Sequence, residues 1–285
     1  MKAGMIGLGA MGAAMAANVA KAGLLGAVWN RTADKAELLA ERLGVTRAAS
    51  VRELAGTVDV LLLCVSADED VLEVVAQIAR GIRPGGMVVD MSTVSSDTAV
   101  EAAAILAARQ AAFLDAPVSG GVEGARNGTL AMMVGGDVEV LEKVRPVLEA
   151  MSQRIVHIGP VGSGQGVKAV NQVLAAGINQ AVTEALAFAQ AQNLPMGKVI
   201  DVLSAGAAGN WFLEHRGATM TRGSFQPGFK LALHNKDLRI CRAMAEKNGA
   251  ATTLLDMTLA DYQDLIAESF GDEDISALFR KKRMD

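Results

Sequence analysis

Gly7-Leu8-Gly9-Ala10-Met11-Gly12 follows the short apolar run Ala3-Gly4-Met5-Ile6 and opens a segment with helical spacing at residues 10–22. A strand, a Gly-x-Gly-x-x-Gly turn and a helix in this order are typical of a dinucleotide-binding unit. The first glycine permits the tight turn, the second lets a pyrophosphate approach the backbone, and the third lets helix and strand pack closely. The phosphates then lie at the unpaired N–H groups of the helix start. Residues 7–12 are therefore predicted to bind NAD or NADP.

Short apolar runs alternate with amphipathic helical segments through the first half of the chain. Residues 58–65 are apolar apart from Asp59, as expected of a strand buried on both faces of a parallel sheet. The alternation predicts an α/β fold, a doubly wound Rossmann sheet with right-handed crossovers. The expected strands are 3–6, 26–29, 58–65, 86–90, 113–116, 130–134 and 155–158, and the expected helices are 10–22, 33–43, 70–80 and 95–109.

The pattern changes to helices alone after Gly159-Pro160-Val161-Gly162. Residues 165–192 are predicted to form one long, largely apolar helix, which must be buried between domains or between subunits. Further helices are expected at 198–204, 210–220, 231–248 and 252–269, with a short piece from Ile275. We predict a dinucleotide-binding Rossmann domain at 1–161 and an all-helical substrate and dimerisation domain at 162–285.

The composition argues against several classes of protein. The chain has 285 residues and a net charge of −4, with acids and bases interspersed, which does not indicate a nucleic-acid surface. Cys64 and Cys241 lie far apart, which argues against a disulfide scaffold or a zinc site and favours a reducing compartment. No apolar stretch approaches the roughly 20 residues that span a bilayer. We expect a cytoplasmic protein with no metal site and no nucleic-acid or membrane partner.

The end of the second strand indicates which dinucleotide is preferred. NAD-preferring sites usually place Asp or Glu there to hold the ribose 2′-hydroxyl, but this strand ends in Trp29-Asn30-Arg31-Thr32. The guanidinium of Arg31 suits a 2′-phosphate, and Asn30 and Thr32 add neutral hydrogen-bonding groups. We therefore predict a preference for NADP. The alternative is an exposed arginine on a loop that accepts NAD as well.

Two further segments contain residues suited to chemistry. Ser119-Gly120-Gly121 exposes consecutive backbone N–H groups beside a hydroxyl, which suits a substrate carboxylate. Lys168 lies alone on an otherwise apolar helix, one turn from the carboxamides of Asn171 and Gln172. A lysine in such surroundings is costly unless it is paired or its pKa is lowered, and a lowered pKa makes it a usable general base. The alternative is a surface lysine whose stem covers apolar neighbours.

Three segments together resemble the β-hydroxyacid dehydrogenase family. They are Gly-Leu-Gly-x-Met-Gly-x-x-Met at 7–15, Asp-x-Pro-Val-Ser-Gly-Gly at 115–121 and Gly-x-Gly-x-x-x-Lys-x-x-Asn at 162–171. The family includes 3-hydroxyisobutyrate dehydrogenases, tartronate semialdehyde reductases and glyoxylate/succinic semialdehyde reductases. The resemblance covers essentially the whole chain. It implies a Rossmann domain, a long connecting helix and an all-helical domain that builds homodimers or homotetramers.

The resemblance also implies roles for individual residues. It makes Lys168 the catalytic acid/base and assigns the substrate carboxylate to the Ser119, Gly120 and Gly121 loop. Many members carry Asn four residues after the lysine, whereas here Gln172 follows Asn171, so either carboxamide is a candidate for substrate contact. The remaining expected substrate contacts are Asp237, Trp211 and Phe212, although the two aromatic residues are equally suited to a core. The remaining expected cofactor contacts are Thr93 and Lys236. Val65 is added to them because it lies at the end of a strand.

The function predicted from these residues is an NADP-preferring oxidoreductase that interconverts a small 3-hydroxy acid and its semialdehyde by hydride transfer, with Lys168 as general acid/base. An NAD-dependent 3-hydroxyisobutyrate or L-serine dehydrogenase is an alternative. An imine reductase usually lacks the lysine and the Pro-Val-Ser-Gly-Gly loop, both of which are present here. The alternative of another class is a non-catalytic NADP-binding sensor or scaffold.

Overall fold

The computed structural model describes residues 1–283, and the chain divides into two compact units, Met1–Lys168 and Ala169–Asp285. Two of its hydrophobic cores lie in the first unit and a third in the second. The division falls within the long helix α8 (Ser163–Ala191), a few residues after the predicted boundary.

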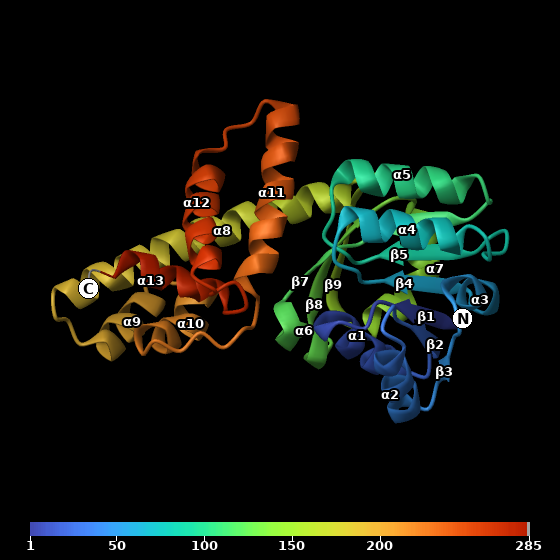
Figure 1. The fold of residues 1–285 in the computed structure, drawn as a ribbon, viewed down its shortest axis with the longest axis horizontal. Helices are drawn as coiled ribbons and strands as arrows, with labels where there is room; N and C mark the ends of the chain where they lie inside the picture. The colour runs from blue at the N-terminus through green and yellow to red at the C-terminus, as the bar shows by residue number, and fades with distance from the viewer. Residues whose placement is uncertain (284–285) are drawn as a thin grey trace. The chain divides into compact units, whose positions relative to one another are not determined.

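The first unit is built on one sheet of nine described strands (Figure 1). The spatial order is β3-β2-β1-β4-β5-β6-β8-β7, with β9 paired to β8. Strands β3 to β6 are parallel, whereas β8 runs antiparallel to both β6 and β7. The strands are β1 (Ala3–Ile6), β2 (Leu25–Trp29), β3 (Thr46–Arg47), β4 (Val60–Leu63), β5 (Met87–Asp90), β6 (Ala112–Asp115), β7 (Val118–Ser119), β8 (Leu130–Gly135) and β9 (Ser152–Gly159).

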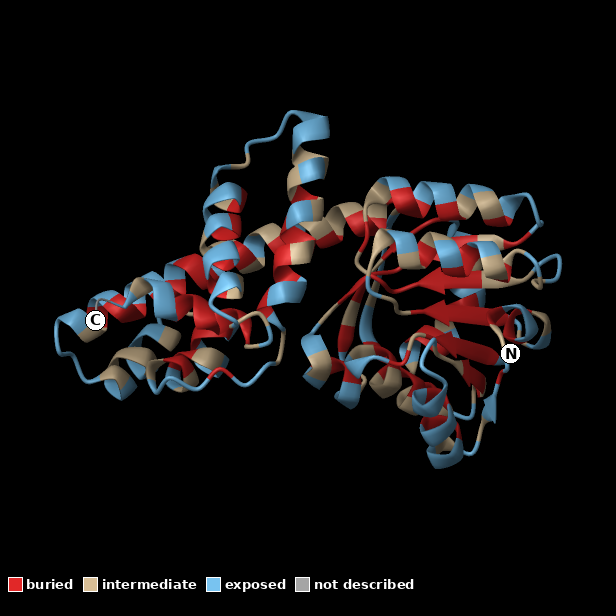
Figure 2. Ribbon diagram, in the orientation of Figure 1, coloured by how far each residue is buried: buried red, intermediate tan, exposed pale blue. Residues whose placement is uncertain are grey.

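Helices cover both faces of this sheet, whose central strands β1, β4, β5 and β6 are apolar and buried on both faces (Figure 2). In β4, Val60 and Leu62 belong to one core and Leu61 and Leu63 to the other, as the two-residue period of a strand requires. One core includes residues of α1 (Ala10–Lys21), α2 (Ala33–Leu43), α6 (Gly121–Asn127) and α7 (Val138–Glu149), and the other includes residues of α3 (Val51–Thr57), α4 (Asp68–Ile78) and α5 (Ser96–Ala107). The predicted doubly wound sheet is confirmed.

Three helices of this unit were not predicted. Helices α3 and α6 have only seven residues each, too few for a periodic pattern to stand out. Helix α7 contains Pro146 in its interior, which argues against a helix when the sequence is taken alone. Strand β4 is shorter than expected, because Val58 caps the end of α3 and the chain leaves the strand after Leu63.

The second unit is entirely helical, as predicted. Its core is packed around Tyr262, Phe279, Leu238 and Met220, all of which are fully buried. Its helices beyond α8 are α9 (Met196–Ser204), α10 (Trp211–Thr221), α11 (Leu231–Asn248), α12 (Thr253–Ala267), the 3₁₀ helix η1 (Ile275–Leu278) and α13 (Phe279–Lys282). Within residues 1–283, no helix combines the length and the apolar character needed to cross a membrane.

Candidate active site

The glycine turn lies between β1 and α1, where the strand order of the sheet reverses. Gly7 has a φ of 89°, and a Cβ there would collide with the carbonyl oxygen of Cys64. A Cβ on Gly12 would collide with the carbonyl oxygen of Gly7, whereas one on Gly9 would meet nothing within 4 Å. Gly7 and Gly12 are therefore required because the backbone of the protein leaves no room for a side chain there, whereas Gly9 borders open space.

The amino end of α1 is suited to an anion. Gly9 is its N-cap residue, which offers no side-chain cap, and the first turn has no acidic residue. The backbone N–H groups of this turn and the positive end of the helix dipole are thus available for phosphate. The turn fits the pyrophosphate of a dinucleotide.

The end of β2 supports the turn. Asn30 Oδ1 accepts a hydrogen bond from the backbone N–H of Leu8 at 2.9 Å, and Asn30 Nδ2 donates to the carbonyl of Thr32 at 3.1 Å. Arg31 is exposed, and its Nη1 lies 3.2 Å from Asp70 Oδ1 of α4. Asn30 thus holds the glycine turn, and Arg31 has an acidic partner that competes for its guanidinium.

The carboxyl ends of β4 and β5 are joined directly. The backbone N–H of Val65 donates to Ser92 Oγ at 2.9 Å, and the half-buried Thr93 follows. Asp90, at the end of β5, accepts the N–H of Ser92 through Oδ1, while its buried Oδ2 has no hydrogen-bond partner among the described residues. Burial raises the pKa of Asp90 to about 6, although its hydrogen bonds with Ser92 act in the opposite direction.

Asp115 connects the end of β6 to the start of α8. Its Oδ1 accepts the backbone N–H of Gly162 at 2.8 Å, and its Oδ2 accepts that of Gln165 at 2.9 Å. The carboxylate thereby satisfies two N–H groups that a helix start would otherwise leave unpaired. Burial raises the pKa of Asp115, and these backbone hydrogen bonds oppose the rise.

Lys168 is buried, with 8% of its surface exposed, so it is not a surface lysine. Its Nζ donates to the carbonyl oxygen of Val118 at 2.9 Å, which brings the ammonium to the residue preceding Ser119. Gly120 has a φ of 130°, so the chain turns sharply directly after Ser119. The lysine and the predicted carboxylate loop are therefore neighbours, although nearly fifty residues separate them in the sequence.

Four polar side chains form a chain of contacts within the helical unit. Asn171 Nδ2 donates to Gln172 Oε1 at 2.7 Å, and Gln172 Nε2 donates to Asp237 Oδ2 at 2.7 Å. Asp237 Oδ1 also lies 3.0 Å from the ammonium of Lys236. Gln172 and Asp237 are both buried, whereas Asn171 is partly exposed. Both ends of the Gln172 carboxamide are thus engaged by neighbouring side chains.

The two candidate aromatic residues of α10 differ in their surroundings. Phe212 is buried in the core of the helical unit. Trp211 is 54% exposed and stacks on His215, with ring centroids 4.4 Å apart. The structure therefore assigns Phe212 to the core and leaves Trp211 at a surface.

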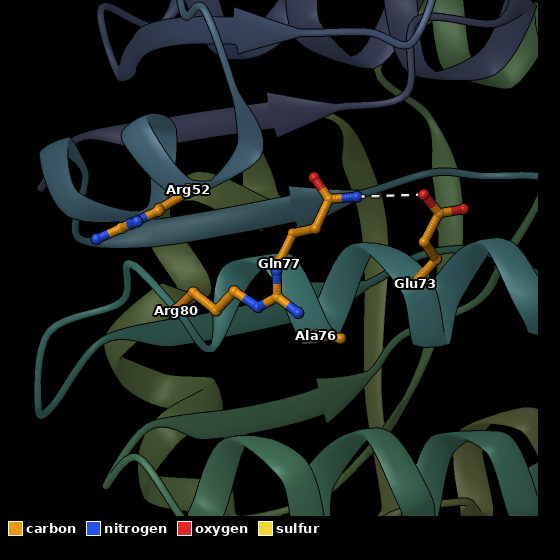
Figure 3. A pocket seen from close by; sticks show the side chains of 5 residues that line it. All are labelled: Arg52, Glu73, Ala76, Gln77 and Arg80. Carbon is orange, nitrogen blue, oxygen red and sulfur yellow. Dashed lines mark hydrogen bonds between the residues drawn. The ribbon is translucent and has the colours of Figure 1, made fainter.

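A hollow on the outer side of α3 and α4 is separate from these residues (Figure 3). Arg80 follows the carboxyl end of α4, whereas the strand ends described above lie at the amino end of that helix. This hollow does not belong to the site. No cluster of His, Cys, Asp and Glu suited to a metal ion occurs in residues 1–283.

Sequence analysis did not single out Gln165. Its side chain is 99% buried, with Nε2 donating to the carbonyl oxygen of Ser92 at 2.8 Å and Oε1 accepting the N–H of Val94 at 3.2 Å. In the motif Gly-x-Gly-x-x-x-Lys-x-x-Asn at 162–171, residue 165 is one of the variable positions, written x. A carboxamide one turn before the lysine, on an apolar helix, was the available signal.

Comparison with known proteins identifies the family. Residues 2–159 match the family model of the NAD binding domain of 6-phosphogluconate dehydrogenase. Residues 162–281 match a second family model, described as NAD-binding of NADP-dependent 3-hydroxyisobutyrate dehydrogenase. The chain is 38% identical to an uncharacterized oxidoreductase of Shewanella frigidimarina, over 99% of each chain. It is 34% identical to the NAD-dependent L-serine dehydrogenase of Pseudomonas aeruginosa, over 96% of this chain and 95% of that one.

A solved structure agrees with this assignment. The 3-hydroxyisobutyrate dehydrogenase of Mycobacterium tuberculosis with L-serine superposes with a TM-score of 0.90 and 32% identity, over 99% of each chain. The similarity to this one enzyme thus extends over both halves of the chain, in their order. The chain belongs to the β-hydroxyacid dehydrogenase family and is an NAD(P)-dependent hydroxyacid dehydrogenase.

Proposed function

We propose that this dehydrogenase interconverts a small 3-hydroxy acid and its semialdehyde, with NADP as the preferred cofactor and Lys168 as the general acid/base. The observation that supports this most directly is the contact between Lys168 Nζ and the carbonyl of Val118, next to Ser119. It brings a proton-transferring group beside a loop suited to a carboxylate. A substrate with a carboxylate and a nearby hydroxyl carbon matches this pairing.

The proposed roles of the residues follow from their chemistry. Ser119 and the backbone N–H groups of Gly120 and Gly121 bind the substrate carboxylate and orient the carbinol carbon. In the oxidative direction Lys168 accepts the hydroxyl proton, and in the reductive direction it donates a proton to the carbonyl oxygen. When bound at the glycine turn, the nicotinamide cofactor supplies the hydride acceptor or donor.

The proposed preference for NADP rests on the end of β2, which has no carboxylate to repel a 2′-phosphate. Arg31 supplies a cation there, and its exposed position leaves it able to exchange Asp70 for phosphate. The Asp70 contact also supports the second candidate, an NAD-dependent enzyme. Since one relative is named an NAD-dependent L-serine dehydrogenase, L-serine and 3-hydroxyisobutyrate are the first substrates to test with both cofactors.

We further propose that Asn171, rather than Gln172, contacts the substrate. The Gln172 carboxamide is buried and bonded at both ends, to Asn171 and to Asp237, so its role is to orient Asn171. Asn171 lies three residues after Lys168, which sets the two side chains on one side of the helix. Thr93, Val65 and Lys236 keep their proposed roles at the cofactor, whereas Asp237 acts through Gln172.

A homodimer or homotetramer is proposed from α8. Val170, Leu174, Ile178 and Phe188 of this helix are exposed apolar residues, and the first three follow a four-residue spacing. An exposed apolar stripe of this kind is typical of a protein–protein interface. A cytoplasmic location is proposed because Cys64 and Cys241 lie far apart in the sequence, without the spacing of a disulfide scaffold.

Turnover assays with purified protein test the proposed function. Small 3-hydroxy acids and their semialdehydes are screened with NADP(H) and NAD(H), using the wild type, Lys168→Ala and the control Lys198→Ala, whose lysine is exposed on α9. Lys168→Ala is expected to reduce kcat by about 10²- to 10⁴-fold, the usual contribution of a general acid or base, and to bind the cofactor normally. Near-normal turnover in Lys168→Ala would refute the assignment.

A further inference from the structure

The side chain of Gln165 forms a hydrogen bond with each of the two peptide groups that flank Thr93. Its Nε2 donates to the carbonyl oxygen of Ser92 at 2.8 Å, and its Oε1 accepts the N–H of Val94 at 3.2 Å. One carboxamide therefore holds the backbone both before and after the residue that is proposed to touch the cofactor. Because the side chain is 99% buried, water does not compete for these bonds.

The backbone of Gln165 is held as firmly as its side chain. Its N–H donates to Asp115 Oδ2 at 2.9 Å, while Asp115 Oδ1 accepts the N–H of Gly162 at 2.8 Å. Asp115 ends β6, and Ser92 follows the end of β5. The first turn of α8 is thus joined to the ends of two adjacent parallel strands, through one residue.

Lys168 lies three residues after Gln165 in the same helix. Side chains three positions apart lie on one side of an α-helix, and the helix fixes their separation along its axis. Lys168 Nζ is held by the carbonyl of Val118, in the loop that follows β6. A displacement of the first turn of α8 would therefore move Lys168 relative to the segment that contains Thr93.

We propose that Gln165 is a positioning residue, which fixes the acid/base Lys168 relative to the cofactor-binding segment 92–94. It touches neither substrate nor cofactor. Its effect is on geometry, and a displacement of about 1 Å at a reacting centre costs on the order of 100-fold in rate. This inference rests on the proposed role of Lys168.

The hydrogen bonds to Ser92 and Val94 specifically require a glutamine at position 165. A carboxamide offers a donor to Ser92 and an acceptor to Val94 from one planar group. Ionised glutamate keeps the acceptor and places a negative charge against the Ser92 carbonyl, whereas protonated glutamate restores a donor. Methionine has a similar length and provides neither bond of comparable strength. These differences allow positioning to be separated from packing.

The test compares Gln165→Glu and Gln165→Met with the wild type. At pH 8 both variants are expected to lose about 10- to 100-fold in kcat, while the dissociation constant of NADPH, measured by fluorescence, changes less than about threefold. As the pH falls from 8 to 5.5, kcat of Gln165→Glu is expected to recover relative to the wild type, and that of Gln165→Met is not. Without cofactor, amide exchange of the peptide containing Val94 is expected to be faster in Gln165→Met than in the wild type, because methionine provides no acceptor for the Val94 N–H.

The matched control is Asn179→Asp, the same change from carboxamide to carboxylate at a buried site of the helical unit. Asn179 Nδ2 donates to Tyr262 and to the carbonyl of Ile275, and it is fully buried. The kcat of Asn179→Asp is expected to stay near the wild-type value at every pH at which the variant is folded. If Gln165→Met does not fold, the pH recovery of Gln165→Glu decides the question alone.

Two outcomes overturn the inference: wild-type kcat in Gln165→Glu at pH 8, or a loss of kcat that does not change with pH. If Lys168→Ala is inactive in the same assay, such an outcome removes only the role of Gln165. If Lys168→Ala turns over normally, the proposed function itself fails, whatever the Gln165 variants do. The two failures are therefore distinguishable.

Discussion

Asn30 accepts a hydrogen bond from the backbone N–H of Leu8 at 2.9 Å, which ties the end of β2 to the glycine turn. The sequence predicts that Asn30 offers a hydrogen-bonding group to the ribose or its 2′-phosphate. Its carboxamide instead spans the turn and the carbonyl of Thr32, at 3.1 Å. We therefore expect Asn30 to affect cofactor binding mainly through the conformation of the glycine turn.

Replacing Asn30 tests this relationship. Asn30→Ala is expected to weaken NAD and NADP binding equally, by about 5- to 15-fold, the equivalent of one hydrogen bond of about 1–1.5 kcal/mol. Asn30→Asp keeps the acceptor and adds a charge, so it is expected to weaken NADP binding more than NAD binding. Dissociation constants measured by titration check both. Unchanged affinities in Asn30→Ala would contradict the role given to this bond.

Arg31 is expected to determine the cofactor preference. Arg31→Ala should lower kcat/KM with NADPH by about 10- to 100-fold, as expected for a lost hydrogen bond to a charged group, and leave that with NADH nearly unchanged. The melting temperature should not change, because the exposed pair with Asp70 contributes less than about 1 kcal/mol. Arg47→Ala, which removes another exposed arginine paired to an acid, is the control. A parallel loss with both cofactors would argue against a 2′-phosphate contact.

Asn171 and Gln172 are expected to respond differently to substitution. Asn171→Ala should reduce kcat/KM by at least about tenfold, since it removes a hydrogen-bonding group from the substrate. Gln172→Met should reduce kcat/KM and also lower the melting temperature, because it removes the hydrogen bond to Oδ2 of the buried Asp237 carboxylate. Kinetics and thermal unfolding of both variants make the comparison. The roles are exchanged if only Gln172→Met affects KM and the two melting temperatures agree.

Asp90 is expected to make stability depend on pH. Burial raises its folded-state pKa from 3.8 to about 6, so the folded state binds more protons than the unfolded state between these values. Its contribution to the free energy of unfolding therefore falls as the pH rises from about 4 to 6, by roughly 3 kcal/mol. Asp90→Asn removes the titration, so the stability of the variant relative to the wild type should increase across this range. Urea unfolding at several pH values measures it, and parallel curves for the two proteins would disprove it.

Phe188 is expected to lie in a subunit interface. Phe188→Glu should shift the protein to a smaller assembly in light scattering, because it places a charge on the exposed apolar stripe of α8. Leu38→Glu on α2 is the control, since Leu38 and Phe188 are both 68% exposed. An unchanged mass for Phe188→Glu, or the same change in both variants, would contradict the interface.

The sequence by itself determined the features that depend on local spacing. Alternating apolar runs and amphipathic segments predicted the Rossmann sheet, and Gly7, Gly9 and Gly12 predicted the turn, because strand and helix periods and glycine conformations are properties of short segments. Lys168 is conspicuous for the same reason, as a lysine on a largely apolar stretch. Strand β8 was found, but its antiparallel direction was not, because a single strand's pattern does not specify its direction in the sheet.

Only the tertiary structure decided what the polar side chains do. Asn30 reaches back 22 residues to Leu8, and Gln165 reaches 73 residues back to Ser92. The partner of a carboxamide depends on which backbone groups the folded chain brings within about 3 Å, and spacing along the sequence does not contain that information. The glycine turn and the lysine can therefore be predicted from the sequence. The hydrogen bonds that hold them in place cannot, because they join residues that only the folded chain brings together.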